Sequence, residues 1–335
     1  MKSIDTKSVK DFLFNNLMII FMIAASIVVG MQRANFFSLA NMGNLISNTS
    51  VRFIVALGVS GCLISRGTDL SAGRSVGLAA CIAATLLQRD GYSQKVYPEL
   101  GEPSMIIVLL VVVAVTMFFG FCNGLVVSFL HVPPFIATLG MQTIVYGICL
   151  VFTGAQPIGG LRRDYTQMAS GVFGSFPFSR ALPYLGFFAL GLGIVMWFMY
   201  NRTAHGKYIY AIGGNEHAAE VSGINTKLTK IVIYTTAGLL YGIAGFLIGG
   251  RAGGSSVNIG FGWELEAIAG CTIGGVSTSG GVGRVSGILL GVLVFELLKI
   301  AMQFMGVEPS YTYIVQGIVI ITAVSLDIRK YIAQK

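Results

Sequence analysis

Long apolar runs alternate with short polar connections along almost the whole chain. In a helix, about 20 apolar residues at 1.5 Å each cross the roughly 30 Å of hydrocarbon in a bilayer. Runs near that length recur with gaps too short for an ordinary soluble domain, which predicts an all-α, polytopic transmembrane helical bundle. The pattern predicts about ten helices, at residues 12–30, 46–66, 71–88, 104–128, 135–153, 183–200, 228–250, 264–276, 284–304 and 311–327.

Some of these predicted spans are short or broken by polar, glycine-rich segments. Helices 46–66 and 71–88 meet at RGTDLSAG, and helix 264–276 runs into GGVSTSGG. Non-helical backbone at membrane depth persists only where protein or a water-filled cavity satisfies its polar groups. A short repeat relates the two places, because Gly61-Cys62 precedes GRSVG and Gly270-Cys271 precedes GRVSG. The match is either a coincidence or a sign of the paired interruptions found along transporter pathways.

Composition agrees with a membrane protein, since the chain is 54% hydrophobic and only 11% charged. Soluble domains carry about 25% charged residues. Small residues four apart, as at Gly238 and Gly242 or Gly287 and Gly291, predict close helix packing. The Lys and Arg residues that give the net charge of +8 are scattered among the membrane spans and form no basic face, so nucleic acid is not an expected partner.

The Lys and Arg residues are biased toward one side of the predicted bundle. Twelve of the 22 fall in segments on the side of the two termini, seven fall on the opposite side, and three lie within spans. Because cytoplasmic loops are enriched in Lys and Arg, both termini and the loop at 201–227 are expected in the cytoplasm.

That cytoplasmic loop has the start and stop signals of a short helix. Asn215 can cap its first turn, Glu216 suits the positive end of the helix dipole, and Gly223 can adopt the left-handed conformation that ends it. We expect a helix of about two turns, which suits docking against a soluble partner.

A few polar residues within the apolar stretches are candidates for function. Asp69 is either a functional or paired intramembrane acid, or an interfacial cap that accepts from the backbone N–H groups of Ser71 and beyond. Asn123 either lines a pathway or makes one interhelical hydrogen bond. Glu296 and Lys299, three residues apart on one helix, are expected to neutralise each other.

The chain offers no signature of its own chemistry. The nucleotide-binding pattern GxxxxGK[ST] does not occur, so a separate chain must bind ATP if ATP drives this protein. The three histidines are scattered, and no nucleophile–His–acid or paired-carboxylate arrangement is recognisable. No catalytic residue, metal or cofactor is therefore expected.

Several long motifs resemble, in the same order, the membrane permeases of bacterial ABC sugar importers of the ribose/galactose type. They are VRFIVALGV at 51–59, GTDLSAGR at 67–74, PFIATLG at 134–140, IYAIGGNEHAAEVSGI at 209–224 and ELEAIA at 264–269. Within this family the galactose/methyl-galactoside permeases are the most similar group, and ribose or another monosaccharide is the alternative cargo. A different class, the ion-coupled secondary transporter, would need intramembrane acids that load a cation. Asp69 and Glu296 alone give weak support for such a cation site.

The resemblance implies a single transmembrane permease domain over 1–335 in the inner membrane. It also implies a homodimer, a cytoplasmic ATP-binding subunit and a periplasmic sugar-binding protein. The residues that it places in an ATPase-coupling loop are Gly213, Gly214, Asn215, Glu216, Ala218, Ala219, Ser222 and Gly223. The residues that it places beside the translocation path are Thr68, Asp69, Ser71, Asn123, Phe135 and Thr138.

Overall fold

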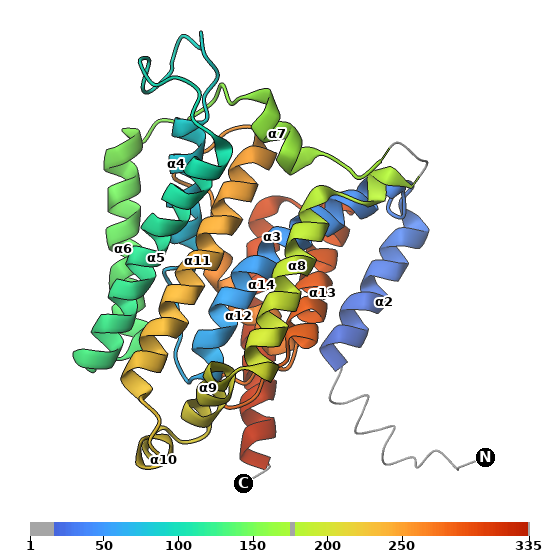
Figure 1. The fold of residues 1–335 in the computed structure, drawn as a ribbon. Coiled ribbons are helices and arrows are strands. Elements are labelled where there is room, and N and C mark those ends of the chain that lie inside the picture. Colours follow the sequence, from blue (N-terminus) through green and yellow to red (C-terminus); the bar gives the residue numbers. More distant parts are fainter. Residues whose placement is uncertain (1–16, 175–177, 334–335) are drawn as a thin grey trace.

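The computed structural model describes residues 17–174 and 178–333, and every named element in these ranges is a helix. The helices stand side by side as one bundle (Figure 1). Ten of them correspond to the ten predicted spans: α2 Leu17–Gln32, α3 Leu39–Ile64, α4 Ala72–Leu86, α5 Met105–Phe129, α6 Pro134–Thr153, α8 Tyr184–Arg202, α11 Thr226–Ala252, α12 Trp263–Ile273, α13 Val285–Phe304 and α14 Pro309–Ala333. The polytopic helical architecture is thereby confirmed, while residues 12–16 of the first predicted helix lie outside the described ranges.

The helices differ in their capacity to cross a membrane. By length and composition, six in the described residues are long and apolar enough: α3, α5, α6, α8, α11 and α13. Shorter apolar stretches occur in α2, α4 and α14. With only 11 residues, α12 spans about 16 Å, roughly half the hydrocarbon thickness.

The start of α3 was predicted too late. The helix begins at Leu39, seven residues before the predicted position, and Ser38 caps it by accepting a hydrogen bond from the Asn41 amide at 3.3 Å. The first two turns contain Asn41, Gly43 and Asn44, and Ser47 follows, so the hydropathy of this part of the helix is low. The helix nevertheless forms here, because Asn41 and Ser47 are buried within the bundle.

The interior of the bundle is built around α3 and α11. In α3, 83% of its most apolar window is buried, against 22% in α5 and in α6, whose apolar faces point outward. The predicted small-residue packing is confirmed at two interfaces. A Cβ at Gly238 would overlap the Thr116 carbonyl of α5, and one at Gly291 would overlap the Gly270 carbonyl of α12.

The short sequence repeat has a structural counterpart at the ends of α3 and α12. The Cys62 carbonyl accepts from the Gly67 amide at 2.8 Å, and the Cys271 carbonyl accepts from the Val276 amide at 2.9 Å. Each helix thus closes with the same six-residue hydrogen bond, and each has a left-handed residue one position before the donor, Arg66 or Gly275. The broken spans are therefore broken in the same way.

Glu296 and Lys299 form the predicted ion pair at 3.0 Å, within a larger charge cluster. Lys299 also contacts Glu266 of α12 at 3.1 Å, and Arg52 of α3 pairs with Glu266 and lies 3.7 Å from Glu296. The Arg52 guanidinium packs over the Trp263 ring, 4.0 Å from its centre. This cluster, defined as Arg52, Glu266, Glu296 and Lys299, has no net charge and ties α3, α12 and α13 together.

The two ends of the bundle carry different short helices (Figure 1). At one end α7 (Arg163–Ser170) packs on α11, where the Tyr165 hydroxyl donates to the Phe246 carbonyl at 2.5 Å. At the other end lie α9 (Ala204–Gly214) and α10 (Glu216–Val221), together with the end of α14.

Candidate functional sites

The predicted short helix in the 201–227 loop is present as α10. The Asn215 side chain accepts from the Ala218 amide at 3.1 Å, so the predicted cap is confirmed. Gly223 has a φ of 86°, a conformation that suits glycine and ends the helical segment. At six residues and about 9 Å, α10 is slightly shorter than predicted. An ion pair of 2.5 Å between Glu216 and Lys230 ties it to α11.

Almost the whole of α10 faces outward from the bundle. Only Ala219 is buried, and Val221 keeps 77% of its surface exposed. Most of the sequence-predicted coupling residues are exposed, namely Gly214, Asn215, Glu216, Ala218, Ser222 and Gly223. A surface of this kind is available to a partner without rearrangement of the bundle.

The preceding helix, α9, was not predicted and connects this surface to the bundle. Thr203 caps it by accepting from the Gly206 amide at 3.1 Å. At its other end Gly213 packs so tightly that a Cβ would overlap the Ile64 carbonyl and the Gly281 amide. These two backbone groups are themselves joined by a hydrogen bond of 2.8 Å.

Arg66 completes this contact, and sequence reasoning missed it. Its guanidinium donates to the Ser279 carbonyl at 2.9 Å and to the Gly214 carbonyl at 2.8 Å. Tyr210 of α9 adds a hydrogen bond to the Gly283 carbonyl at 2.9 Å. We call the meeting of the α3 end, the α9 end and the loop at 277–283 the α9 junction. The only signal for Arg66 was a charged residue directly after the last turn of an apolar helix.

Asp69 lies in the segment between α3 and α4 and is fully buried. Its Oδ1 accepts from the Ser71 amide at 3.0 Å and from the Ser71 hydroxyl at 2.6 Å, as the cap prediction required. Its Oδ2 accepts from the Tyr241 hydroxyl of α11 at 3.1 Å. The side chain is 0% exposed, so Asp69 is enclosed by the bundle, and its depth relative to the membrane interface stays a prediction.

The neighbouring polar residues extend this arrangement to α5 and α6 and add a second contact from α11. Asn123 of α5 donates to the Ser71 hydroxyl at 3.0 Å, which is the interhelical bond considered for it. Thr138 of α6 accepts from the Leu70 amide at 3.1 Å, and Tyr234 of α11 donates to the Thr68 carbonyl at 3.4 Å. These contacts satisfy non-helical backbone at depth in the bundle.

Five of the six residues predicted beside the path are therefore gathered around the segment at 67–71. Phe135 is the exception: 55% of its surface is exposed, and it does not join the polar group. The motif that suggested it, PFIATLG, contributes Thr138 instead, one turn further along α6. Glu264 at the start of α12 was missed; it is buried, and its Oε2 has no hydrogen-bond partner among the described residues.

Replacing Asp69 with alanine is expected to destabilise the protein by about 2–4 kcal/mol. The Ser71 amide and the Tyr241 hydroxyl would remain buried without an acceptor, at a cost of about 1–3 kcal/mol for each group. Thermal unfolding of the purified protein in detergent measures the effect. Asp69→Asn keeps an acceptor for Ser71 and should retain most of the stability. An alanine variant with wild-type Tm would show that these bonds contribute nothing.

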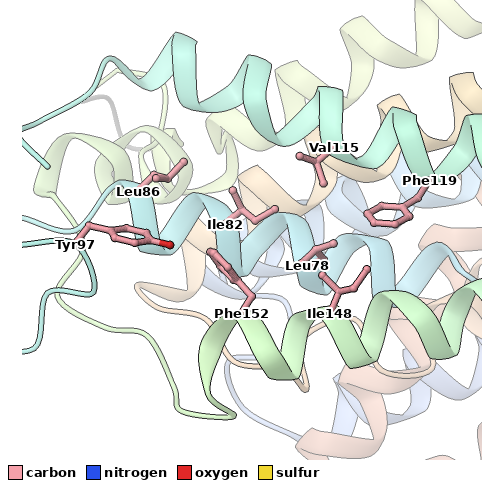
Figure 2. A pocket seen from close by; sticks show the side chains of 8 residues that line it. All are labelled: Leu78, Ile82, Leu86, Tyr97, Val115, Phe119, Ile148 and Phe152. Atoms are coloured by element: carbon pink, nitrogen blue, oxygen red, sulfur yellow. The ribbon is translucent and has the colours of Figure 1, made fainter.

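Two hollows among the described residues differ in chemistry. The first, of about 240 Å³, lies between α4, α5 and α6 and is lined by apolar side chains, with Tyr97 at one end (Figure 2). The second, of about 650 Å³, is bordered by Arg74, Asn258 and several aromatic rings. Only the second has the mixed lining typical of sites for polar small molecules.

Comparison with known proteins gives a consistent result. Residues 41–324 match the family model described as branched-chain amino acid transport system / permease component. The chain is 42% identical to the galactose/methyl galactoside import permease protein MglC of Escherichia coli (strain K12), over 100% of both chains. It is 32% identical to the ribose import permease protein RbsC of the same strain, over 96% of both chains. No solved structure matches the chain significantly. The resemblance read from the motifs is confirmed, and this multi-pass helical protein belongs to the branched-chain amino acid transport system / permease component family.

Proposed function

We propose that the chain is the membrane-spanning permease of an ABC importer that carries galactose and methyl galactoside. The observation that carries this proposal is the 42% identity to a galactose/methyl galactoside permease over the entire chain. The ribose permease aligns over nearly the same length at only 32% identity, which makes ribose the second candidate.

The α10 surface is the proposed contact for a separate cytoplasmic ATP-binding subunit. It is capped at Asn215, closed at Gly223 and fixed to α11 by the Glu216–Lys230 pair, so it moves as a stiff unit. Force applied there reaches the transmembrane helices through the α9 junction, because Arg66 joins Gly214 to the loop after α12. ATP binding and hydrolysis on the partner would thereby shift α3 and α12 and expose a central path to each side in turn.

This proposal fixes the orientation and the other partners. The α9–α10 end and both termini are cytoplasmic in a bacterial inner membrane, in line with the Lys and Arg bias. The α7 end faces the periplasm, where a sugar-binding protein delivers the cargo. The whole chain serves as one permease domain, and two copies form the translocation unit.

An ion-coupled carrier is less well supported by the geometry. Glu296 is paired with Lys299 and lies close to Arg52, and Asp69 already accepts three hydrogen bonds. Loading a cation on either acid would require these contacts to break.

Reconstitution in lipid vesicles tests the proposed function. With the binding protein and the ATP-binding subunit supplied, radiolabelled galactose should accumulate only when ATP is present inside. A preference for ribose would replace the proposed cargo. Uptake that persists without ATP while an ion gradient is maintained would overturn the ABC mechanism.

Loss of the α10 cap is expected to lower galactose uptake about two- to fivefold. Asn215→Leu removes the acceptor for the Ala218 amide, worth about 1 kcal/mol, and allows the first turn to fray. Gly223→Pro should act in the same direction, since proline cannot adopt the φ of 86° found there. Uptake is measured at matched membrane protein level. Unchanged uptake in both variants would count against coupling through α10.

A further inference from the structure

The larger hollow, a cleft of about 650 Å³, lies in the half of the bundle nearer α7. It reaches Ile248 and Ala252 in the last turns of α11, the end of that helix farthest from α10. The residues that carry the argument come from α4, α6, α12, α14 and the loop before α12: Arg74, Tyr146, Asn258, Phe261, Trp263 and Tyr313. Segments distant in sequence therefore converge on one space, and the coupling and polar residues described above do not line it.

Arg74 is the most informative residue of the cleft. Its guanidinium lies 4.1 Å from the centre of the Tyr146 ring and 5.0 Å from that of Phe261, and it donates to the Val257 carbonyl at 3.0 Å. No carboxylate of the described residues lies within ion-pair distance of it. The carboxylate of Glu264, buried at the start of α12, interacts with it electrostatically without forming an ion-pair contact. An ionisable side chain within a membrane bundle marks a functional site by default. The aromatic rings stabilise its charge and fix its orientation while leaving further N–H donors unused by side chains.

The other residues that line the cleft supply further polar groups and the flat apolar surfaces that a sugar site needs. A monosaccharide presents hydroxyl groups along its edge and an apolar C–H face. Arg74 and Asn258 offer hydrogen-bond donors, and Asn258 also offers an acceptor. Tyr313, 60% exposed, and Trp263 offer flat apolar surfaces, and Trp263 is held in place by Arg52 of the charge cluster. The apolar pocket of Figure 2 offers no comparable set of donors.

We propose that this cleft is a sugar-contact site on the periplasmic half of the translocation path. Arg74 and Asn258 hold hydroxyl groups of a neutral monosaccharide, and Trp263 and Tyr313 contact its C–H face. The assignment rests on the proposed function, which supplies both the cargo and the orientation. A small solute that carries a carboxylate, such as an amino acid, would also suit an arginine among aromatic rings, and the experiment below distinguishes the two.

The test uses the complete transporter in vesicles with saturating galactose-loaded binding protein. Transported galactose and hydrolysed ATP are measured together, because the ratio of the two reports on sugar handling separately from ATPase coupling. Arg74→Gln should lower galactose transported per ATP at least fivefold, with stimulated ATP hydrolysis within twofold of wild type. Excess leucine should leave wild-type galactose uptake unchanged. Inhibition by leucine would instead assign the cleft to amino acids.

A matched pair of variants on α14 controls for general damage. Tyr313 and Tyr311 are both 60% exposed and lie two residues apart, but only Tyr313 lines the cleft. Tyr313→Ala removes the ring that contacts the C–H face and should lower the sugar-to-ATP ratio about two- to threefold, and Tyr311→Ala should not change it. If Arg74→Gln fails to assemble, the comparison of the Tyr313 and Tyr311 variants tests the sugar-contact site on its own.

The outcomes separate this inference from the proposed function. Failure of the wild-type complex to transport galactose would refute the function itself. Normal wild-type transport with an unchanged ratio in both Arg74→Gln and Tyr313→Ala would refute only the sugar-contact site.

Discussion

Replacing Gly213 with alanine is expected to reduce galactose uptake at least tenfold. The new Cβ would overlap the Ile64 carbonyl of α3 and the Gly281 amide, the two groups whose hydrogen bond closes the α9 junction. Both are backbone atoms, so no side-chain rotation can relieve the overlap, and α9 must move away from the bundle. Uptake and ATP hydrolysis stimulated by the binding protein are the measurements, and uptake should fall further than hydrolysis.

The adjacent glycine provides a matched control. A Cβ at Gly214 meets nothing within 4 Å, so Gly214→Ala has the same chemistry without the overlap. This variant should retain uptake within twofold of wild type. Equal losses of uptake in both variants would mean that the change from glycine to alanine in this segment lowers uptake by itself, and that the close packing at Gly213 is not the cause. Normal uptake in Gly213→Ala would remove the α9 junction from the coupling route.

Replacing Glu266 with alanine is expected to destabilise the bundle by about 3–5 kcal/mol. Removing one member of a buried ion cluster leaves uncompensated charge, here on Arg52 and Lys299, which would share Glu296. The side chains of all four members are at most 18% exposed, so water compensates little of this loss. We expect the Tm in detergent to fall by about 5–10 °C.

A charge-balanced double variant separates charge from packing. Glu266→Gln with Lys299→Met removes one positive and one negative charge and keeps side chains of similar size. It should recover at least half of the lost Tm, because buried ion pairs can be replaced by uncharged groups at little cost. A double variant less stable than Glu266→Ala would show that the hydrogen bonds matter more than charge balance. A wild-type Tm in Glu266→Ala would show that the cluster does not stabilise the bundle.

Features encoded over a few neighbouring residues were predictable from the sequence. The Asn215 cap, the Gly223 end and the Glu296–Lys299 pair each depend on spacings within one or two turns of helix. The bond from Ser71 to Asp69 is of the same kind. Such contacts form wherever the helix forms, because the backbone places both partners.

The misses have a common physical origin in burial and long-range packing. α3 begins before its apolar pattern, and two of the polar side chains there, Asn41 and Ser47, are buried within the bundle. Arg66 was overlooked because its partners, Gly214 and Ser279, are about 150 and 210 residues away along the chain. Phe135 does not join the polar group at 67–71, because the direction in which its side chain points depends on how α6 packs; its position beside the path stays a prediction.

By itself, the sequence determined the helical membrane architecture, because only helices satisfy their own backbone polar groups across an apolar layer, and each such run is visible as hydropathy. It also determined the short capped helix at 216–221, whose signals are local. Only the tertiary structure brought Asp69 to Tyr241, Arg66 to Gly214 and Arg74 to the aromatic cleft. These contacts join helices that are far apart in sequence, and interhelical packing is set by the fit of whole surfaces, which no local pattern encodes.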